Sequence, residues 1–189
     1  MGYTAPVRTV TLITTGGTIE KTYDEQTGEL TNRRTLVRRM LDELRLEDTK
    51  VSVIELMSKD SLDLTPHDRS RILDAVRLAG ATDEDEALPC DGVVILHGTD
   101  TLDQTGELLH DQLADLRVPV VLTGAIRPFE MKRSDALQNL TEALFASGVL
   151  PPGVYSVAHG RALRFPGVRK DRQLGTFYLL ERDENSQAG

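Results

Sequence analysis

The sequence predicts an α/β fold: a three-layer sandwich around a mostly parallel, doubly wound sheet of the Rossmann-like or flavodoxin-like kind. Apolar runs of strand length alternate with amphipathic stretches of helical period over most of the chain. The run 93–96, Val-Val-Ile-Leu, is apolar throughout, which is typical of a parallel strand covered on both faces. Polar loops follow the first four runs, and loops that leave the carboxyl ends of parallel strands open on one edge of the sheet.

The apolar runs predict five strands, at 7–14, 51–57, 93–96, 118–123 and 153–158. Pro119 lies at the start of the fourth run, where a missing N–H is tolerated. Two further extended segments are expected at 162–164 and 176–180. The segment 21–32 is polar and turn-rich, so we expect either a mobile lid or a short surface hairpin.

Apolar residues at helical spacing predict four helices, at 36–44, 65–80, 101–116 and 136–148. Thr65, Pro66 and Asp68 are the residue types preferred at the N-cap, the first and the third position of a helix. Thr101 and Gln104 have capping-box spacing, so the third helix is expected to start with that motif.

The length of 189 residues fits one domain, and we expect a single α/β domain at 1–180 and a polar tail at 181–189. The formal net charge of -8 argues against a nucleic-acid partner or an anionic membrane, because both need a basic face. Cys90 is the only cysteine, so no intrachain disulfide forms. The sequence shows neither a signal-peptide pattern nor an apolar run of membrane-spanning length, so a cytoplasmic protein is expected.

The turn after the first strand, Thr15-Gly16-Gly17-Thr18, lies at the edge where open α/β sheets place their ligand sites. Two glycines let the backbone turn tightly and let a ligand approach it closely. We therefore expect Thr18 to be a nucleophile on which the other motifs converge. The alternative is a Gly-Gly turn that only joins a strand to a loop.

A threonine hydroxyl is a poor nucleophile until a base takes its proton. Asp100, which follows the third strand, is too weak a base by itself at neutral pH. Lys170 is a candidate partner, because burial and neighbouring charges can hold a lysine partly neutral. Tyr23 lies close after Thr18 in the sequence and is a second candidate base. The alternatives are a solvated loop lysine and a surface aromatic side chain.

The sequence indicates neither a catalytic histidine nor a bound cofactor. His97 is not assigned as the base, since a histidine at the buried end of an apolar strand is more often hydrogen-bonded and structural. His67, His110 and His159 have no spacing suited to a metal site. The Gly-Gly turn lacks both the Rossmann spacing and the Walker lysine, which argues against a nucleotide cofactor. We therefore expect neither a metal nor another cofactor.

Three stretches stand at the ends of predicted strands: Thr15-Gly16-Gly17-Thr18-Ile19, His97-Gly98-Thr99-Asp100-Thr101-Leu102 and Gly124-Ala125-Ile126-Arg127-Pro128. Ser134-Asp135 and Asn139-Leu140 follow the third. Together they resemble the bacterial-type L-asparaginase and glutaminase family over nearly the whole chain. The resemblance implies an amidohydrolase that converts L-asparagine to L-aspartate and ammonia through a threonine acyl-enzyme, with weaker glutaminase activity.

The resemblance also implies catalytic roles for matching residues. Thr18 is similar to the primary nucleophile, and Tyr23 to the loop tyrosine that hydrogen-bonds it. Thr99, Asp100 and Lys170 resemble a second group, in which the threonine positions the attacking water and the lysine adjusts its proton.

For substrate binding, Ser58 resembles the residue that holds the α-carboxylate, and Asp100 resembles the partner of the α-ammonium. Lys59 stands where many relatives carry a glutamine, and a cation there repels the α-ammonium unless it points away. The whole set expected to contact substrate is Gly17, Ser58, Lys59, Gly98, Thr99 and Asp100.

Family members usually carry a second, smaller domain, and that domain of a neighbouring subunit completes the amino-group site. The present chain resembles compact members without it. We therefore expect a homo-oligomer, a dimer or a tetramer, that acts on a small-molecule substrate, L-asparagine.

Two alternatives stay open. One is the amidase subunit of a tRNA-dependent amidotransferase, which shares these motifs. The other is a non-catalytic ligand-binding or interaction module on the same fold. The intact set Thr18, Thr99, Asp100 and Lys170 favours an enzyme, because a retired enzyme has no physical need to keep all four side chains.

Overall fold

The computed structural model describes residues 6–82 and 90–180, and its centre is a six-stranded sheet in the order β4-β1-β5-β6-β7-β8. The strands are β1 (Arg8–Gly16), β4 (Thr49–Lys59), β5 (Gly92–Leu96), β6 (Pro119–Thr123), β7 (Gly153–Ala158) and β8 (Arg161–Arg164). The first five pair in parallel, and β8 joins as an antiparallel edge strand. The predicted mostly parallel, doubly wound sheet is therefore confirmed.

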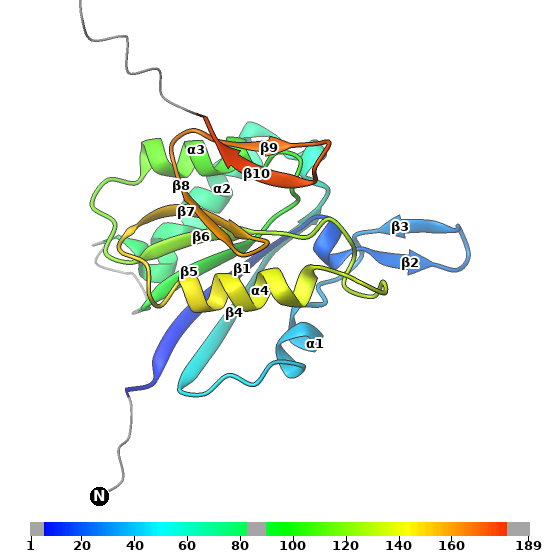
Figure 1. The fold of residues 1–189 in the computed structure, drawn as a ribbon, viewed down its shortest axis with the longest axis horizontal. Helices are drawn as coiled ribbons and strands as arrows, with labels where there is room; N and C mark the ends of the chain where they lie inside the picture. Colours follow the sequence, from blue (N-terminus) through cyan, green and yellow to red (C-terminus); the bar gives the residue numbers. More distant parts are fainter. Residues whose placement is uncertain (1–5, 83–89, 181–189) are drawn as a thin grey trace, which may run out of the picture.

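Helices cover both faces of the sheet and complete the predicted three layers (Figure 1). The α-helices are α1 (Val37–Asp42), α2 (Pro66–Val76), α3 (Leu102–Gln112) and α4 (Ala136–Ala146). Short turns of helix follow β1, β4 and α2: η1 (Thr18–Glu20), η2 (Ser61–Asp63) and η3 (Arg77–Ala81). Helices α2 and α3 pack on one face, whereas α1 and α4 pack on the other.

The core consists of two apolar clusters, one on each face of the sheet. Neighbouring residues of β1, Leu12 and Ile13, belong to different clusters, because successive strand side chains point to opposite faces. Ile13 packs in the cluster that contains Ile72 of α2, and Leu12 in the cluster that contains Met40 of α1. All four side chains are fully buried, and each such burial stabilises the fold by about 1.5–3 kcal/mol.

Strands β1 and β5 form the topological switch point of the sheet. The chain runs from β1 to β4 on one side and then returns to β5 on the other side. Strands β1 and β5 pair from Val10 opposite Gly92 to Thr14 opposite Leu96, so their carboxyl ends lie level. Open α/β sheets bind ligands outside the strand ends at this point. The loops after β1 and β5, which contain Thr18 and Thr99, leave from there.

Two hairpins lie outside the central sheet. One pairs β2 (Thr22–Asp24) with β3 (Glu29–Thr31), and the other pairs β9 (Val168–Asp171) with β10 (Thr176–Leu179). Of the two structures expected for 21–32, the structure has the short surface hairpin. The extended segments expected at 162–164 and 176–180 correspond to β8 and β10.

Strand β4 continues two residues beyond its predicted end. Lys59 pairs with Gly16 of β1, so Ser58 lies within the strand and the prediction of a loop at Ser58 was wrong. The pairing uses backbone groups, which are the same for polar and apolar residues. The apolar run therefore ended before the strand did.

The capping predicted from the sequence is present at the start of α2 but absent at the start of α3. The Thr65 hydroxyl accepts a hydrogen bond from the backbone N–H of Asp68, and the Asp68 carboxylate accepts one from the backbone N–H of Thr65. This capping box at α2 confirms the prediction. The capping box expected at Thr101 was wrong, because the Thr101 hydroxyl donates to the carbonyl of Ser61 at 2.8 Å instead.

None of the helices in the described part of the chain has the length and apolar character needed to cross a membrane. The tail expected at 181–189 lies outside the described residues. The division into one domain and a tail stays a prediction.

Gly106 of α3 lets the helix approach the connection between β8 and β9. A Cβ at Gly106 would lie 2.0 Å from Cζ of Phe165, a side chain that is buried. The close contact is possible only because position 106 has no side chain. It fixes the segment that leads into β9 against α3.

We expect Gly106→Ala to lower the free energy of unfolding by about 1–3 kcal/mol, because the added methyl group overlaps the Phe165 ring. At an open helix position the same change would stabilise by about 1 kcal/mol. Urea unfolding measures the difference. Gln112→Ala, exposed on the same helix, is the control and should stay within about 0.5 kcal/mol of the wild type. A Gly106→Ala protein at least as stable as the wild type would contradict this packing.

Candidate active site

The loops after three strands meet at two glycines, Gly17 and Gly98, where there is no room for a side chain. Gly17 has a φ of +85°, and a Cβ there would lie 2.4 Å from Cα of Gly98. A Cβ on Gly98 would in turn lie 2.6 Å from Oγ of Ser61. The backbone N–H of Gly17 also donates to the carbonyl of Lys59 at 2.8 Å. The loops after β1, β4 and β5 are therefore in direct contact, as their place at one sheet edge predicts.

Thr18 begins the turn η1 directly after this contact and is half-buried. The buried carboxylate of Glu20 holds the turn: it accepts from the backbone N–H of Gly16 at 3.2 Å and of Leu36 at 3.3 Å, and from the Thr35 hydroxyl. Burial raises the pKa of Glu20, and these hydrogen bonds partly counter that effect. The Thr18 side chain thus leaves a turn of fixed geometry.

The structure brings Thr99, Asp100 and Lys170 together. The Lys170 ammonium donates to Oγ1 of Thr99 at 2.7 Å and to Oδ1 of Asp100 at 2.9 Å. The lysine side chain is only 11% exposed, so this ion pair is partly shielded from water and stronger than a surface pair. Because Thr99 accepts from the ammonium, its own hydroxyl proton is available to orient a ligand or a water molecule.

Helix α3 supports the hairpin that carries Lys170. Oε1 of Glu107 accepts from the backbone N–H of Gly167 at 2.9 Å and from Arg169 at 2.5 Å. The Arg169 guanidinium also donates to the carbonyl of Val168. These contacts fix the start of β9, two residues before Lys170 and close to the place where Phe165 packs on α3.

Ser58 and Lys59 are the two substrate-binding residues expected from β4. Unlike Thr99 and Asp100, neither forms a hydrogen bond with Lys170 in the described part of the chain. Ser58 is exposed, although its backbone lies beside Gly16. The Lys59 ammonium binds both carboxylate oxygens of Asp68 at 2.8 Å, at the N-terminal end of α2. The hydrogen bond from Lys59 and those from Thr65 hold the pKa of Asp68 well below its usual range. The lysine charge is therefore already paired.

Ser61 is a site residue that was not predicted from the sequence. Its side chain is 1% exposed, and its hydroxyl has no hydrogen-bond partner among residues 6–82 and 90–180. A buried hydroxyl without a partner costs about 1–3 kcal/mol, which a bound ligand can recover. The available signal was the second serine of Ser58-Lys59-Asp60-Ser61, which the contact with Gly98 places at the strand ends.

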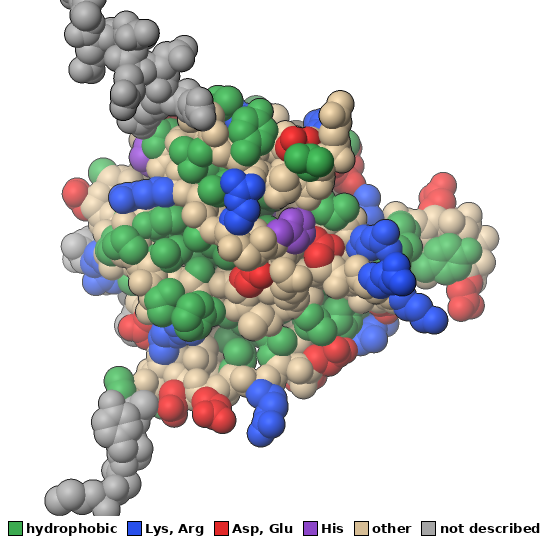
Figure 2. Space-filling model, viewed as in Figure 1, with side chains coloured by type: hydrophobic (Ala, Val, Ile, Leu, Met, Phe, Trp, Pro, Cys, Tyr) green, Lys and Arg blue, Asp and Glu red, His purple; other side chains and the backbone are tan. Residues whose placement is uncertain are grey.

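Tyr23 lies on β2 and is 58% exposed. The β2–β3 hairpin stands out from the body of the molecule, and basic side chains gather at its base on the face shown in Figure 2. Within the described ranges, no hydrogen bond joins the Tyr23 hydroxyl to Thr18. The structure therefore brings Thr18, Thr99, Asp100 and Lys170 to one edge, and leaves Tyr23 on the projecting hairpin.

His97 is fully buried and hydrogen-bonded on both ring nitrogens. Nδ1 lies 2.8 Å from the carbonyl oxygen of Gly98, and Nε2 lies 2.8 Å from the Thr105 hydroxyl. Burial lowers the pKa of His97 to about 4, so the ring is neutral at pH 7. This agrees with the structural role expected from the sequence, and the ring holds the loop that leads to Thr99.

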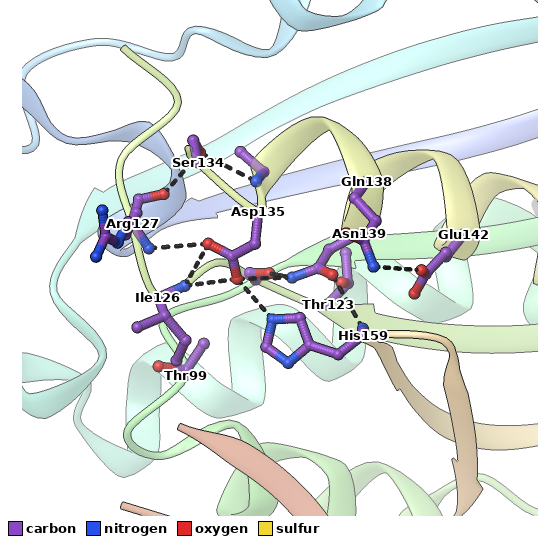
Figure 3. Close-up of polar contacts among 12 residues, drawn as sticks. Thr99, Thr123, Ile126, Arg127, Ser134, Asp135, Gln138, Asn139, Glu142 and His159 are labelled. Carbon is purple, nitrogen blue, oxygen red and sulfur yellow. Dashed lines mark hydrogen bonds and ion pairs between the residues drawn. The ribbon is translucent and has the colours of Figure 1, made fainter. Parts of the chain in front are cut away.

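Asp135 is a second residue for which the sequence predicted no role (Figure 3). Its carboxylate accepts from the backbone N–H groups of Ile126 and Arg127, the amide of Asn139 at 3.0 Å and the imidazole of His159 at 2.8 Å. Burial raises its pKa, but the hydrogen bonds from Ile126, His159 and Arg127 outweigh burial and leave the pKa below its usual range. The sequence signal was only the Ser134-Asp135 pair shared with the family.

Within the described residues, no group of three or more histidine, cysteine, aspartate and glutamate side chains is arranged to hold a metal ion. The polar groups around Thr99 are instead hydroxyls, the Asp100 carboxylate and the Lys170 ammonium. Such a set suits nucleophilic attack and hydrogen bonding to a small polar ligand.

Known proteins are similar to this chain over most of its length. The family model described as "Asparaginase, N-terminal" matches residues 9–176. An L-asparaginase of Thermococcus kodakarensis is 35% identical over 133 residues, which are 70% of this chain and 38% of that protein. A glutamyl-tRNA(Gln) amidotransferase subunit of Thermoplasma acidophilum is 34% identical over 143 residues, 75% of this chain and 33% of that protein. The match thus spans about a third of the length of these curated relatives.

Two solved structures have the same fold. L-asparaginase I from Vibrio cholerae superposes with a TM-score of 0.75 at 27% identity, over 93% of this chain and 52% of that one. The thermostable L-asparaginase from Thermococcus kodakarensis gives a TM-score of 0.68 at 25% identity, over 96% of this chain and 58% of that one. This chain corresponds to slightly more than half of each.

The depressed pKa of His97 predicts a pH-dependent stability. Between pH 6.5 and about 4 the unfolded chain binds a proton at His97 that the folded chain does not bind, so stability is full above pH 6.5 and falls as the pH falls to 4. The free energy of unfolding near pH 4 is expected to be lower than that above pH 6.5 by on the order of 3 kcal/mol. Urea unfolding of the wild type and of His97→Gln at pH 7.5 and pH 5 measures it. The variant should lose less stability between the two pH values, and equal losses would contradict the prediction.

Proposed function

This chain belongs to the asparaginase family, and we propose that it hydrolyses the side-chain amide of L-asparagine to L-aspartate and ammonia, with weaker action on L-glutamine. The observation that carries the proposal is the hydrogen bond from Lys170 to Thr99 and Asp100 at the edge where Thr18 lies. A lysine that is largely shielded from water and paired with both a hydroxyl and a carboxylate fits an organising role in a reactive site better than a surface role.

The reaction would proceed in two steps. The Thr18 hydroxyl attacks the amide carbon, a C–O bond forms, the C–N bond breaks, and ammonia leaves with the hydroxyl proton. Water then attacks the ester, which releases aspartate and restores the hydroxyl. Thr99 would orient the attacking water, while Lys170 and Asp100 fix the Thr99 hydroxyl and balance the charge that develops. Backbone N–H groups near Thr99 would hold the oxyanion.

For substrate binding we propose Ser61 as the serine that holds the α-carboxylate, in place of the expected Ser58. Its hydroxyl is buried, lacks a partner in the described part of the chain and touches the Gly17–Gly98 contact through Gly98. Asp100 remains the proposed partner of the α-ammonium. Lys59 is paired with Asp68, so the repulsion expected from its charge is reduced.

The second candidate function is the glutamine-hydrolysing subunit of a tRNA-dependent amidotransferase. The observation that favours it is the nearly equal identity of the amidotransferase subunit and the L-asparaginase, 34% and 35%. The assembly of several copies, the cytoplasmic location and the role of Tyr23 as a second base stay predictions.

We expect Thr18→Ala to lower ammonia release from L-asparagine by roughly four or more orders of magnitude, because the nucleophile is removed. Thr18→Ser keeps a hydroxyl and should retain part of the activity. A coupled ammonia assay on both amides gives kcat and KM for each variant. Equal activity of the wild type and Thr18→Ala would reject Thr18 as nucleophile. Ammonia release from glutamine alone would favour the amidotransferase subunit.

Substitution of Ser61 should weaken substrate binding, whereas substitution of Ser58 should not. Ser61→Ala should raise KM for asparagine about ten- to hundredfold, because a hydrogen bond to a charged carboxylate contributes about 1.5–3 kcal/mol. Ser58→Ala, at an exposed position of the same strand end, is the matched control and should change KM by no more than about twofold. The reverse ranking would restore Ser58 as the carboxylate contact.

A further inference from the structure

The loop after β6, residues 124–128, lies beside the two parts of the site that come from β5 and from the β9–β10 hairpin. We call it the β6 loop. On one side it touches the β5 loop. A Cβ at Gly124 would lie 2.2 Å from the carbonyl oxygen of His97 and 3.1 Å from Cγ2 of Thr99. Any movement of Gly124 toward β5 would therefore displace Thr99.

The β6 loop also borders the hairpin that carries Lys170. A Cβ built on Gly175, between β9 and β10, would lie 3.6 Å from Cγ1 of Ile126, an ordinary van der Waals distance. Gly175 and Lys170 belong to the same short hairpin, in which Phe177 pairs with Lys170. The Ile126 side chain therefore lies next to Gly175 and limits how far the hairpin can move toward the β6 loop.

The N-terminal end of α4 fixes the backbone of the β6 loop. The Asp135 carboxylate accepts from the N–H groups of Ile126 and Arg127 at 3.0 Å each. The Ser134 hydroxyl donates to the carbonyl of Arg127 at 3.0 Å, and the Asn139 amide donates to the carbonyl of Gly124 at 2.8 Å. Figure 3 shows these contacts converging on the loop beside Thr99. Four backbone groups of the loop are therefore held from one helix end.

His159 closes the network from the turn between β7 and β8. Its imidazole donates to Oδ2 of Asp135, and its backbone N–H donates to Oδ1 of Asn139 at 3.0 Å. These bonds fix the rotamers of the two side chains that hold the loop. His159 therefore holds the Asp135 and Asn139 side chains from an element outside the β6 loop.

We propose that Asp135 is a positioning residue: through the β6 loop and Ile126 it sets where the Lys170 hairpin lies relative to Thr99. Asp135 itself touches neither Thr99 nor Lys170. The effect of Asp135 on catalysis rests on the proposed function. Its effect on the Lys170 hairpin does not, because it can be measured without an activity assay.

The variant that tests this is Asp135→Asn in the full chain. The amide keeps the size of the carboxylate but replaces one acceptor oxygen by a donor, so the N–H groups of the β6 loop and His159 can no longer all be satisfied. Glu142→Gln is the matched control. Glu142 lies on the same helix, but its carboxylate accepts from the Gln138 amide and from the backbone N–H of Gly160, both at 2.9 Å, and not from the β6 loop.

Hydrogen exchange read by peptide mass spectrometry reports how firmly the hairpin is held in place, because amides of a loosened segment exchange faster. We expect Asp135→Asn to raise exchange at 124–128 and 167–179 at least several-fold, while β1 and β5 stay as protected as in the wild type. Glu142→Gln should leave 167–179 unchanged. Ile126→Ala, at a partly exposed position, removes the contact with Gly175 without touching Asp135 and should raise exchange at 167–179 in the same way.

Kinetics give the second readout. Asp135→Asn should lower kcat for amide hydrolysis by about 10–10²-fold with little change in KM, because a displacement of about 1 Å between reacting groups costs up to 10²-fold. Glu142→Gln should retain wild-type kinetics. A uniform rise of exchange over the whole chain would mean that Asp135 only stabilises the fold, and would overturn the proposal.

The outcomes separate this inference from the proposed function. A wild type that releases no ammonia from asparagine or glutamine would reject the proposed function, yet the exchange at 167–179 would still decide the positioning role. Unchanged exchange at 167–179 in both Asp135→Asn and Ile126→Ala would overturn the positioning role even if the activity of Asp135→Asn falls.

Discussion

The contact between the backbones of Gly17 and Gly98 is the constraint on which the site depends. It allows no side chain on Gly17, because a Cβ there would lie 2.4 Å from Cα of Gly98, and Ser61 excludes a side chain on Gly98 in the same way. The two loops leave neighbouring strands whose ends lie level, so their separation is set by the sheet itself. Thr18 follows the first glycine and Thr99 the second. Their relative position is therefore a property of the backbone, to which Ser61 and Lys170 are added from other elements.

The polar groups around this contact follow a common pattern. Glu20, Asp68 and Asp135 each use a carboxylate with little solvent access to accept backbone N–H groups at the start of a turn, a helix or a loop. A satisfied carboxylate of this kind fixes backbone geometry, since moving the loop would leave several donors without an acceptor. Ser61 departs from the pattern, because its hydroxyl is buried and has no partner in the described part of the chain. Ser61 therefore leaves hydrogen-bonding capacity where the proposed ligand would lie.

The sequence predicted the sheet because apolar periodicity reports burial, and burial decides which face of each strand or helix points inward. It placed Thr18, Thr99 and Asp100 at one edge because parallel strands share a direction. It failed where tertiary contacts compete with local signals: Thr101 gives its hydroxyl to Ser61 instead of a cap, and β4 continues past the apolar run by backbone pairing. The role of Asp135 depends on partners up to 24 positions away, which local pattern does not encode.

The distance along the chain between Thr99 and Lys170 has a consequence for synthesis. The two residues are 71 positions apart, and the lysine hairpin follows every strand of the parallel sheet. A chain growing from its N-terminus exposes the Thr18 turn and the Thr99 loop long before β9 leaves the ribosome. Such a nascent chain has the hydroxyls but lacks the cation that organises them. Under the proposed mechanism, reactivity would therefore be withheld until the hairpin of β9 and β10 has been made.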